Sequence, residues 1–468
     1  MAEKIPMNPP MIIYGERKTA VQKKAIEVLT EYLLDFTFEY TPCYPYGAFA
    51  NTEKFYTIYV GTKENNPYIK ENSTAVLTKP EEYYIKAGKD GAIIEGFDDA
   101  GVLYGCVDFY NRYLVEQDFM IGNTFGRAGD VMGDFELQSA PAIKNRGLWT
   151  WGHVIYDYKG YIDNMVKLKM NTLIMWNEFV PLNAKEIYEY AHASGVKLVW
   201  GYTWLYNFNK PMDLSTIYDK VDGILNEFER DYKEISGDGI YFQTFTEYTD
   251  ENANGVDIAR TATDFVNHVA GRFYEKYPDL EIQFGLHAIS CKNKLDIIKD
   301  VDPRIQIVWE DCGAFPFAYS PMAVSNFDET YAFAEKIATL RGDKENFGVV
   351  LKGCTCLDWA NFKHHDGPFN VGVSSKRMIK NRVERKSRGW RWAQTYWVTN
   401  GKYAQKMIKM LAEKTNGNMW MTDLVEDGVF EDKIYVPTAI YGELMWNPDI
   451  DFEYLYKLVT LRWNVEFI

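Results

Sequence analysis

The chain has 468 residues, of which 47% are hydrophobic and 25% charged, the balance of a soluble globular protein. This length predicts two or three domains, or one large barrel with a smaller domain. The formal net charge of −15 argues against a partner with a phosphate backbone, so we expect no nucleic acid to bind.

The N-terminus does not look like a targeting signal. Its first stretch, "MAEKIPMNPPMIIYG", lacks the basic segment and the apolar core of a signal peptide. No run reaches the roughly 18 apolar residues that a membrane span needs, so we expect no membrane partner. The chain is therefore expected to be cytoplasmic, or secreted with the signal peptide absent from this chain. A homo-oligomer stays open, as does an extension past Ile468.

Residues 1–135 carry the pattern of a small α+β domain. Helical periodicity alternates there with short β-rich runs that Gly, Lys and Asp turns bound. The segments are a helix over 18–36, strands over 55–62, 81–88 and 91–97, and a helix over 98–117. The stretch "ELQSAPAIKN" follows as a linker, with Pro141 near the boundary.

Residues 140–468 repeat one pattern, a short apolar strand followed by an amphipathic helix. The eight strands are expected over 143–152, 171–177, 197–206, 239–247, 281–288, 304–313, 348–359 and 437–446. Eight such units predict a (β/α)8 TIM barrel, an α/β fold. A doubly wound sheet would need a GxGxxG loop after its first strand, and "NRGLWTWGH" is not one.

Polar and aromatic residues gather where these strands end. Active sites of TIM barrels lie at the carboxyl ends of the strands, so we expect these side chains to line a ligand site. They are Arg146, Trp151, His153, Trp176, Asn177, Tyr202, Trp204, Glu247, His287, Trp309, Glu310, Asp311, Asp358, Trp359, Glu443 and Trp446. A barrel without a ligand has no reason to place them there.

The spacing of polar residues indicates which of them face the barrel interior. Three neighbouring strands each carry a glutamine four residues before a titratable residue, and strand side chains alternate with period two. The pairs are Gln243 with Glu247, Gln283 with His287, and Gln306 with Glu310. This alternation favours Glu310 over Asp311 as the inward group, and Asp358 shares a face with Lys352.

Other chemistries find less support. A metal-dependent barrel hydrolase would carry a His-x-His on an early strand, whereas His153 stands alone on the first one. The six cysteines match no zinc spacing, and no GxSxG is present. We therefore expect no metal and no cofactor. The loop residues His364 and His365 are either exposed or form a rim contact to substrate.

Carboxylates and aromatic side chains together are the apparatus of glycoside hydrolysis. One acid protonates the leaving oxygen, and a second carboxylate acts as base or nucleophile. The acid needs a raised pKa, and Glu247, between Phe245 and Tyr248 in the local sequence, is the candidate. Flat aromatic rings would hold the apolar face of a sugar.

Two stretches resemble known glycosidases. "GFDDAGVLYGCVDFYNRYL" is similar to the α+β domain that precedes the barrel in β-N-acetylhexosaminidases and α-glucuronidases. "APAIKNRGLWTWG" resembles their first barrel strand, where an Arg-Gly pair places the arginine on the −1 sugar. The resemblance covers most of the chain as architecture and implies that Arg146 binds this sugar.

The same resemblance implies catalytic roles. In these families the general acid is a glutamate at the end of strand 4, which matches Glu247. Base carboxylates from strands 6 and 7 of the α-glucuronidases would correspond to Glu310 or Asp311 and to Asp358. The hexosaminidases carry an Asp-Glu pair at strand 4, whereas this chain has Thr246 before Glu247.

The sequence therefore predicts a glycoside hydrolase with Glu247 as general acid and Glu310 or Asp358 as base or nucleophile. Its carbohydrate substrate would be an N-acetylhexosaminide or a uronide. Expected substrate contacts are Arg146, Trp151, His153, Trp176, Asn177, Trp204, His287, Trp309, Trp359, His365, Glu443 and Trp446. The alternatives are a non-catalytic carbohydrate-binding barrel and a metal-dependent barrel hydrolase. Sugar, linkage, cleavage mode and stereochemical outcome stay open.

Overall fold

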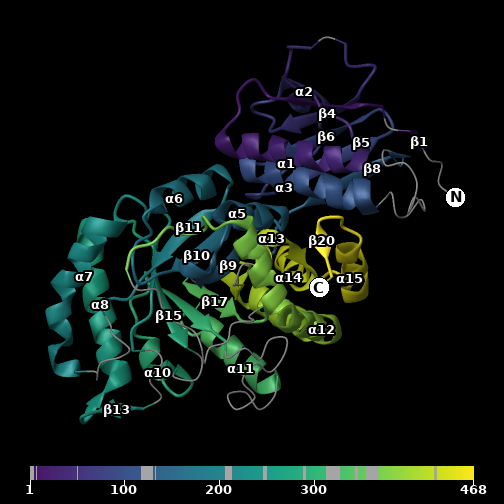
Figure 1. Ribbon diagram of the computed structural model, residues 1–468. Helices are drawn as coiled ribbons and strands as arrows, with labels where there is room; N and C mark the ends of the chain where they lie inside the picture. The colour runs from purple at the N-terminus through teal and green to yellow at the C-terminus, as the bar shows by residue number, and fades with distance from the viewer. Residues whose placement is uncertain are drawn as a thin grey trace. The chain divides into compact units, whose positions relative to one another are not determined.

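The computed structural model describes residues 5–6, 8–49, 51–116, 130–131, 133–205, 213–245, 250–287, 291–311, 327–342, 346–354, 367–425 and 429–467. The chain forms two compact units, which Figure 1 shows as ribbons. The first unit is Met1–Pro141 with His192–Gly195 and Glu453–Val465. The second is Ala142–Ala191, Val196–Phe452 and Glu466–Ile468. No helix within the described ranges is long and apolar enough to cross a membrane.

The first unit is built on a six-stranded mixed sheet in the order β3-β2-β4-β6-β5-β8. Strand β5 runs antiparallel to its neighbours β6 and β8, and the other pairings are parallel. The strands of this sheet are β2 (Pro10–Tyr14), β3 (Cys43–Pro45), β4 (Tyr56–Gly61), β5 (Tyr83–Gly88), β6 (Gly91–Gly96) and β8 (Phe135–Ser139). A separate two-stranded sheet pairs β1 (Ile5–Pro6) with β7 (Asp130–Val131). The helices are α1 (Ala20–Thr37), α2 (Pro67–Asn72), α3 (Asp99–Asp108) and the π-helical η1 (Phe109–Val115). The α+β fold of this part is confirmed.

Side-chain caps start the two long helices of this unit. The hydroxyl of Thr19 accepts a hydrogen bond from the Gln22 amide at 3.2 Å and opens α1. The carboxylate of Asp98 accepts one from the Gly101 amide at 2.8 Å and opens α3. The two helices pack against each other, and α3 also packs on β5 and β6 (Figure 1).

The second unit is a closed barrel of eight parallel strands, which confirms the predicted TIM barrel. The strands, in the order in which they pair around the barrel, are β9 (Asn145–Trp151), β10 (Thr172–Trp176), β11 (Lys197–Gly201), β12 (Ile240–Phe242), β15 (Ile282–His287), β16 (Gln306–Glu310), β17 (Phe347–Leu351) and β18 (Trp420–Leu424). Strand β18 pairs with β9 and closes the barrel, with Trp420 opposite Asn145.

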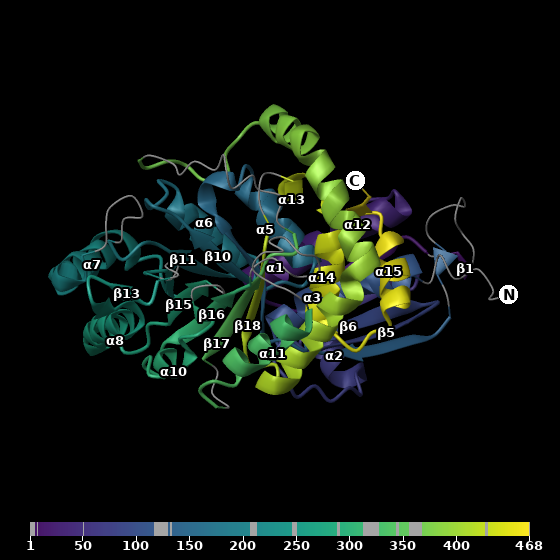
Figure 2. The same cartoon turned by 90° about the horizontal axis from the view of Figure 1, so that it is seen from below.

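Helices surround this barrel (Figure 2). They are α5 (Tyr158–Lys167), α6 (Ala184–Ala193), α7 (Val221–Glu227), α8 (Ile258–Lys276), α10 (Leu295–Ile298), α11 (Phe327–Ala338), α12 (Lys376–Thr415), α13 (Val429–Asp432) and α14 (Val436–Trp446). Shorter pieces are η2 (Gly152–Val154), η3 (Leu214–Lys220), η4 (Phe228–Tyr232), β13 (Asn252–Ala253), β14 (Val256–Asp257), β19 (Ile434–Tyr435) and β20 (Val465–Glu466). The 40-residue α12, light green in Figure 2, packs on α11, α13 and α14.

The prediction for the eighth strand is wrong. Residues 437–446 belong to the helix α14, and the eighth strand is β18 at Trp420–Leu424. Every residue of α14 is buried and most are apolar, so no polar face marks a helical period in its sequence. Strand β18 has five residues and begins at Trp420, shortly after α12 ends at Thr415, so the sequence pattern alone does not separate it from the preceding connection.

The end of the chain also departs from the expected domains. The sequence predicted one barrel domain from residue 140 to 468, whereas Glu453–Val465, which contains most of α15 (Phe452–Thr460), belongs to the first unit. There the ring of Trp463 lies 6.4 Å from that of Phe36, and the Asn464 amide donates to the Tyr32 hydroxyl at 3.3 Å.

Large inward side chains fill the barrel. This core cluster includes Trp149, Trp151, Ile174, Trp176, Val199, Tyr241, Val308, Val350, Trp420 and Leu424. Small inward residues make room for them. A Cβ on Gly201 would lie 2.8 Å from the Trp176 ring. A Cβ on Gly147 would instead meet the neighbouring strand, 1.7 Å from the Thr172 carbonyl oxygen, so glycine there permits the approach of two backbones. The barrel is thus packed beneath the carboxyl ends of its strands, which we call the mouth.

Candidate active site

Glu310 is the carboxylate that the described strands bring into the mouth of the barrel. It ends β16, and the Tyr241 hydroxyl donates a hydrogen bond to its Oε1 at 2.5 Å. The Gln243 amide donates to the same oxygen. The Lys352 ammonium lies 3.3 Å from Oε2, and both side chains of this ion pair are buried. Three donors, two from the β12 segment and one from the residue after β17, therefore fix the orientation of this carboxylate.

The alternation of strand side chains explains why Glu310 faces inward. Its neighbour Asp311 follows the end of β16, and the Asp311 Oδ2 accepts a hydrogen bond from the Lys352 backbone amide at 3.3 Å. Glu310 reaches Tyr241 in the core cluster, as the spacing from Gln306 predicts. Glu310 is therefore the better placed of the two carboxylates for chemistry in the mouth.

His287 ends the adjacent strand and pairs in register with Glu310. Burial lowers its pKa, and the charge of Lys352 lowers it further, while the charge of Glu310 opposes both. The imidazole is therefore neutral at neutral pH. A neutral imidazole offers one donor and one acceptor nitrogen to a polar ligand.

Glycine makes the approach of Tyr241 to Glu310 possible. A Cβ on Gly285 would lie 2.0 Å from the Tyr241 hydroxyl oxygen and 2.8 Å from Cγ of Gln243. Gly285 lies two residues before His287, on the same inward face of β15. The sequence "QFGLH" thus supplies both a space and a polar side chain to the mouth.

Aromatic rings lie beside this cluster. Trp151 and Trp176 end β9 and β10 and pair in register. The Trp176 ring meets that of Tyr241 edge to face at 5.9 Å, and the Trp151 ring meets that of Trp149 in the same way at 4.8 Å. The two tryptophans belong to the core cluster and form its layer nearest the mouth. Such rings suit the apolar face of a ligand.

Asn177 follows Trp176 and is 1% exposed, yet neither polar atom of its amide has a hydrogen-bond partner within the described part of the chain. The absence of a side chain at Gly152 leaves room for this amide, since a Cβ there would lie 2.1 Å from the Asn177 Oδ1. A buried amide without partners costs free energy unless a ligand or water satisfies it. Its donor and acceptor are therefore available to a polar ligand.

His153 lies in the turn η2 directly after β9. Its ring centre lies 6.4 Å from that of Phe369, in edge-to-face orientation.

Leu205 and Phe245, which follow β11 and β12, have φ angles of +53° and +59°. Left-handed backbone is rare for such bulky residues, and strain of this kind gathers at functional sites.

Two tryptophans expected in the mouth lie outside the barrel wall. Trp204 stacks on Phe242 with ring centres 3.4 Å apart and also meets Phe273 of α8. Trp309 meets Phe333 of α11. Both rings fill the space between strands and helices, so their expected role in substrate binding is not supported.

Arg146, Glu443 and Trp446 lie at the amino end of the barrel strands. The Arg146 guanidinium donates to the carbonyls of Lys169 and Ile143 at 2.9–3.0 Å. The Lys169 ammonium lies 3.3 Å from the Glu443 carboxylate and 4.8 Å from the Trp446 ring centre. This cluster is buried and opposite the mouth, which excludes the expected contacts of these residues with a sugar there.

Two residues that the sequence did not suggest support the mouth. Tyr241 contacts Glu310 directly. It lies two residues before Gln243, so strand alternation places both on the inward face, and this spacing could have identified Tyr241 from the sequence. Asp423 of β18 accepts a hydrogen bond from the Cys354 amide at 3.3 Å. Burial, and to a smaller extent the charge of Asp311, raise the pKa of Asp423 well above its usual value. No sequence signal marks this buried aspartate.

Four predicted site residues lie outside the described residues: Glu247, Asp358, Trp359 and His365. Glu247 follows the strained Phe245 by two positions, and Asp358 follows Cys354 by four. Their roles stay predictions. Within the described ranges, no group of three His, Cys, Asp or Glu side chains could hold a metal ion.

The sequence matches no protein-family profile and no curated protein. Solved structures nevertheless share its fold. A glycoside hydrolase family 138 enzyme that targets pectin rhamnogalacturonan II is 13% identical, with a TM-score of 0.53 over 95% of this chain and 65% of that one. A family 115 4-O-methyl-α-glucuronidase with specificity for decorated arabinogalactans is 13% identical, with a TM-score of 0.55 over 95% of this chain and 57% of that one.

A β-N-acetylhexosaminidase from Bacteroides fragilis is 15% identical, with a TM-score of 0.55 over 98% of this chain and 92% of that one. The chain spans less than two thirds of the first two enzymes and most of the third. At these identities the likeness concerns the fold. It confirms the predicted architecture, a glycoside-hydrolase-like TIM barrel with a preceding α+β unit.

Proposed function

We propose that this protein is a glycoside hydrolase whose active site is the mouth of the barrel. The observation that carries the proposal is the inward carboxylate of Glu310, oriented by Tyr241, Gln243 and Lys352 beside a layer of tryptophan rings. The three solved proteins named above, which share the fold, are glycoside hydrolases of different families. Their substrates do not transfer at such low identity, so the site chemistry has to support the activity.

The proposed reaction uses two carboxylic groups. Glu247 gives its proton to the glycosidic oxygen as the bond from that oxygen to the anomeric carbon breaks. As this bond breaks, Glu310 or Asp358 either takes a proton from the water that attacks the anomeric carbon or attacks that carbon itself. In the second case a glycosyl-enzyme forms, and water then cleaves its bond to the carboxylate while Glu247 takes the proton of that water. Donors on both oxygens of Glu310 hold the carboxylate in one orientation, which either role requires.

The substrate would lie against Trp151 and Trp176. The buried amide of Asn177 and the neutral imidazole of His287 would bind its hydroxyl or acyl groups. An N-acetylhexosaminide and a uronide are the two substrate classes that the sequence resemblance suggests. The ammonium of Lys352 already pairs with Glu310, so it provides no free positive charge for a uronate.

One observation favours a second candidate, a carbohydrate-binding barrel without catalysis. The ion pair of Glu310 with Lys352 resembles a structural pair, because both groups are buried and each satisfies the other. Such a protein would keep the tryptophan layer and the amide of Asn177, and it would bind glycans without cleaving them.

Hydrolysis of a panel of aryl glycosides tests the proposal. We expect Glu247→Gln and Glu310→Gln each to lower kcat/KM by about 100-fold to 10,000-fold, as loss of an acid or base does. The matched control is Glu251→Gln, an exposed carboxylate four residues after Glu247, which should retain activity. Binding of glycans with no cleavage of any panel member would support the second candidate, and activity lost on exhaustive chelation would support a metal-dependent hydrolase.

A further inference from the structure

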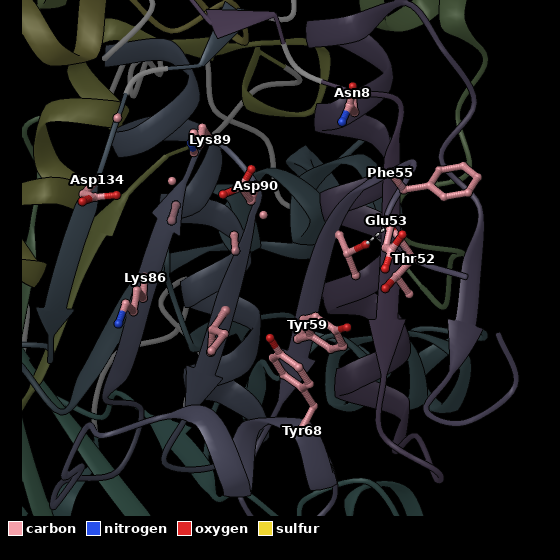
Figure 3. Close-up of a pocket in the computed structure, with 17 residues that line it drawn as sticks. Asn8, Thr52, Glu53, Phe55, Tyr59, Tyr68, Lys86, Lys89, Asp90 and Asp134 are labelled. Atoms are coloured by element: carbon pink, nitrogen blue, oxygen red, sulfur yellow. Dashed lines mark hydrogen bonds between the residues drawn. The ribbon is translucent and has the colours of Figure 1, made fainter. Parts of the chain in front are cut away.

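The first unit has a pocket on the face of its sheet opposite α1 and α3. Alternation along the strands decides which side chains line it. A Cβ on Gly105 of α3 would lie 2.7 Å from Ile94, so Ile94 faces the helices. Its neighbour Ile93 therefore faces the other way, and so do Tyr59 and Lys86, which are in register with it. Figure 3 shows this pocket, with Tyr59 on β4 and Lys86 on β5, the two strands that flank β6.

Two stacked tyrosine rings form one end of the pocket. Tyr59 comes from β4 and Tyr68 from α2, and their ring centres lie 3.4 Å apart with 8° between the planes. Both side chains are half-buried. The stack joins a strand to a helix, so the rings form a rigid aromatic wall, which Figure 3 shows beside the sheet.

Charged side chains of both signs surround the rest of the pocket. They are Glu53, Lys86, Lys89, Asp90 and Asp134, all exposed. Figure 3 shows Lys86 and Asp134 on the side away from Glu53, with Lys89 and Asp90 at the end away from the tyrosines. Three carboxylates and two ammonium groups nearly cancel, so the rim offers many hydrogen-bonding groups with little net charge.

We propose that this pocket is a binding site for neutral oligosaccharides, separate from the barrel mouth. Sugars present apolar C–H faces that pack on aromatic rings and hydroxyls that bond to carboxylates and ammonium groups. The aromatic wall and the mixed rim supply both kinds of contact in one concave surface. The three carboxylates would repel a polyanion. A purely apolar ligand would desolvate all five charged groups without forming hydrogen bonds to them, which costs free energy. The pocket would hold a glycan whether or not the barrel cleaves it.

Hydrogen–deuterium exchange tests this site in the whole protein. The probes are neutral hexasaccharides of β-1,4-linked glucose, xylose, mannose or N-acetylglucosamine. At least one should slow exchange over residues 52–59 and 84–93, and Tyr68→Ala should raise its Kd about tenfold or more, the loss of roughly one aromatic contact. The control Tyr40→Ala removes a tyrosine that is 81% exposed in the same unit and should change nothing.

Asp90→Ala, in the exposed turn between β5 and β6, gives a second variant that leaves the aromatic wall intact, and it too should weaken binding. The proposal is overturned if none of the hexasaccharides protects these two segments, or if protection survives both variants. Equal protection by polygalacturonate would contradict a neutral ligand. A change of molecular mass in Tyr68→Ala would point to a second copy of the chain as the occupant. Because the readout is local to the first unit, failure here is distinguishable from failure of the proposed hydrolysis.

Discussion

The close fit of Gly285 against Tyr241 and Gln243 leads to a quantitative expectation for Gly285→Ala. The new Cβ would lie 2.0 Å from the Tyr241 hydroxyl oxygen and 2.8 Å from Cγ of Gln243. The tyrosine must then move by more than about 1 Å to reach contact distance, which breaks its hydrogen bond to Glu310. Overpacking costs about 1–3 kcal/mol and loss of a hydrogen bond to a charged group about 1.5–3 kcal/mol. We expect the free energy of unfolding to fall by about 3–5 kcal/mol.

Urea titration followed by tryptophan fluorescence measures this change. The control is Gly271→Ala in α8, where a Cβ would meet nothing within 4 Å, and alanine should stabilise that helix by up to about 1 kcal/mol. In the double variant, Tyr241→Phe removes the oxygen that lies 2.0 Å from the new Cβ, while the ring carbon Cζ stays 2.5 Å from it. The hydrogen bond to Glu310, which each single variant loses, is then counted only once. The combined cost should therefore be at least about 1 kcal/mol below the sum of the single costs. Additive costs, or a Gly285→Ala protein as stable as the wild type, would refute the reasoning.

Two further predictions concern other charged groups of the barrel. Glu443→Gln removes the carboxylate that pairs with the buried Lys169 ammonium, so we expect the free energy of unfolding, measured by urea titration, to fall by about 3–5 kcal/mol. The KM of the folded protein should not change. A raised KM at unchanged stability would place Glu443 in the substrate site instead. The folded pKa of His287 lies below its unfolded value of about 6.5, so the unfolded state binds more protons between the two values and stability falls as pH drops through that window. Thermal unfolding at pH 7.5, 6.5 and 5.5 should show this loss in the wild type and in the exposed control His268→Gln, and a smaller loss in His287→Gln.

Periodicity was enough to predict seven of the eight barrel strands and the inward orientation of Glu310. The same strand pattern also argues against two residues predicted to lie in the site. Trp309 precedes Glu310, so the alternation that turns the glutamate inward turns the tryptophan outward. Arg146 is the second residue of β9 and lies five residues before Trp151. At 3.3 Å per residue it is about 16 Å from the mouth.

Other features depended on contacts that no local pattern contains. The helix α14 is buried on all sides by the barrel and α12, so its sequence has no polar face that would reveal a helical period. Asp423 approaches Cys354 only because β18 pairs with β17, and β18 was not foreseen. The ion pair of Lys169 with Glu443 joins residues near the two ends of the barrel segment along the chain. A single sequence contains no signal for a contact between residues so far apart.

The inclusion of a late segment of the chain in the N-terminal unit has a consequence for folding during synthesis on the ribosome. The first unit contains Glu453–Val465, and the barrel closes only when β18 pairs with β9. Neither unit can therefore reach its final contacts until these late segments have left the ribosome, although the residues of the first sheet emerge much earlier. Such long-range closure is slow and leaves sheet edges open in the meantime. A ribosome-stalled chain that ends before residue 420 should accordingly bind chaperones and resist neither protease nor urea, whatever the stability of the finished protein.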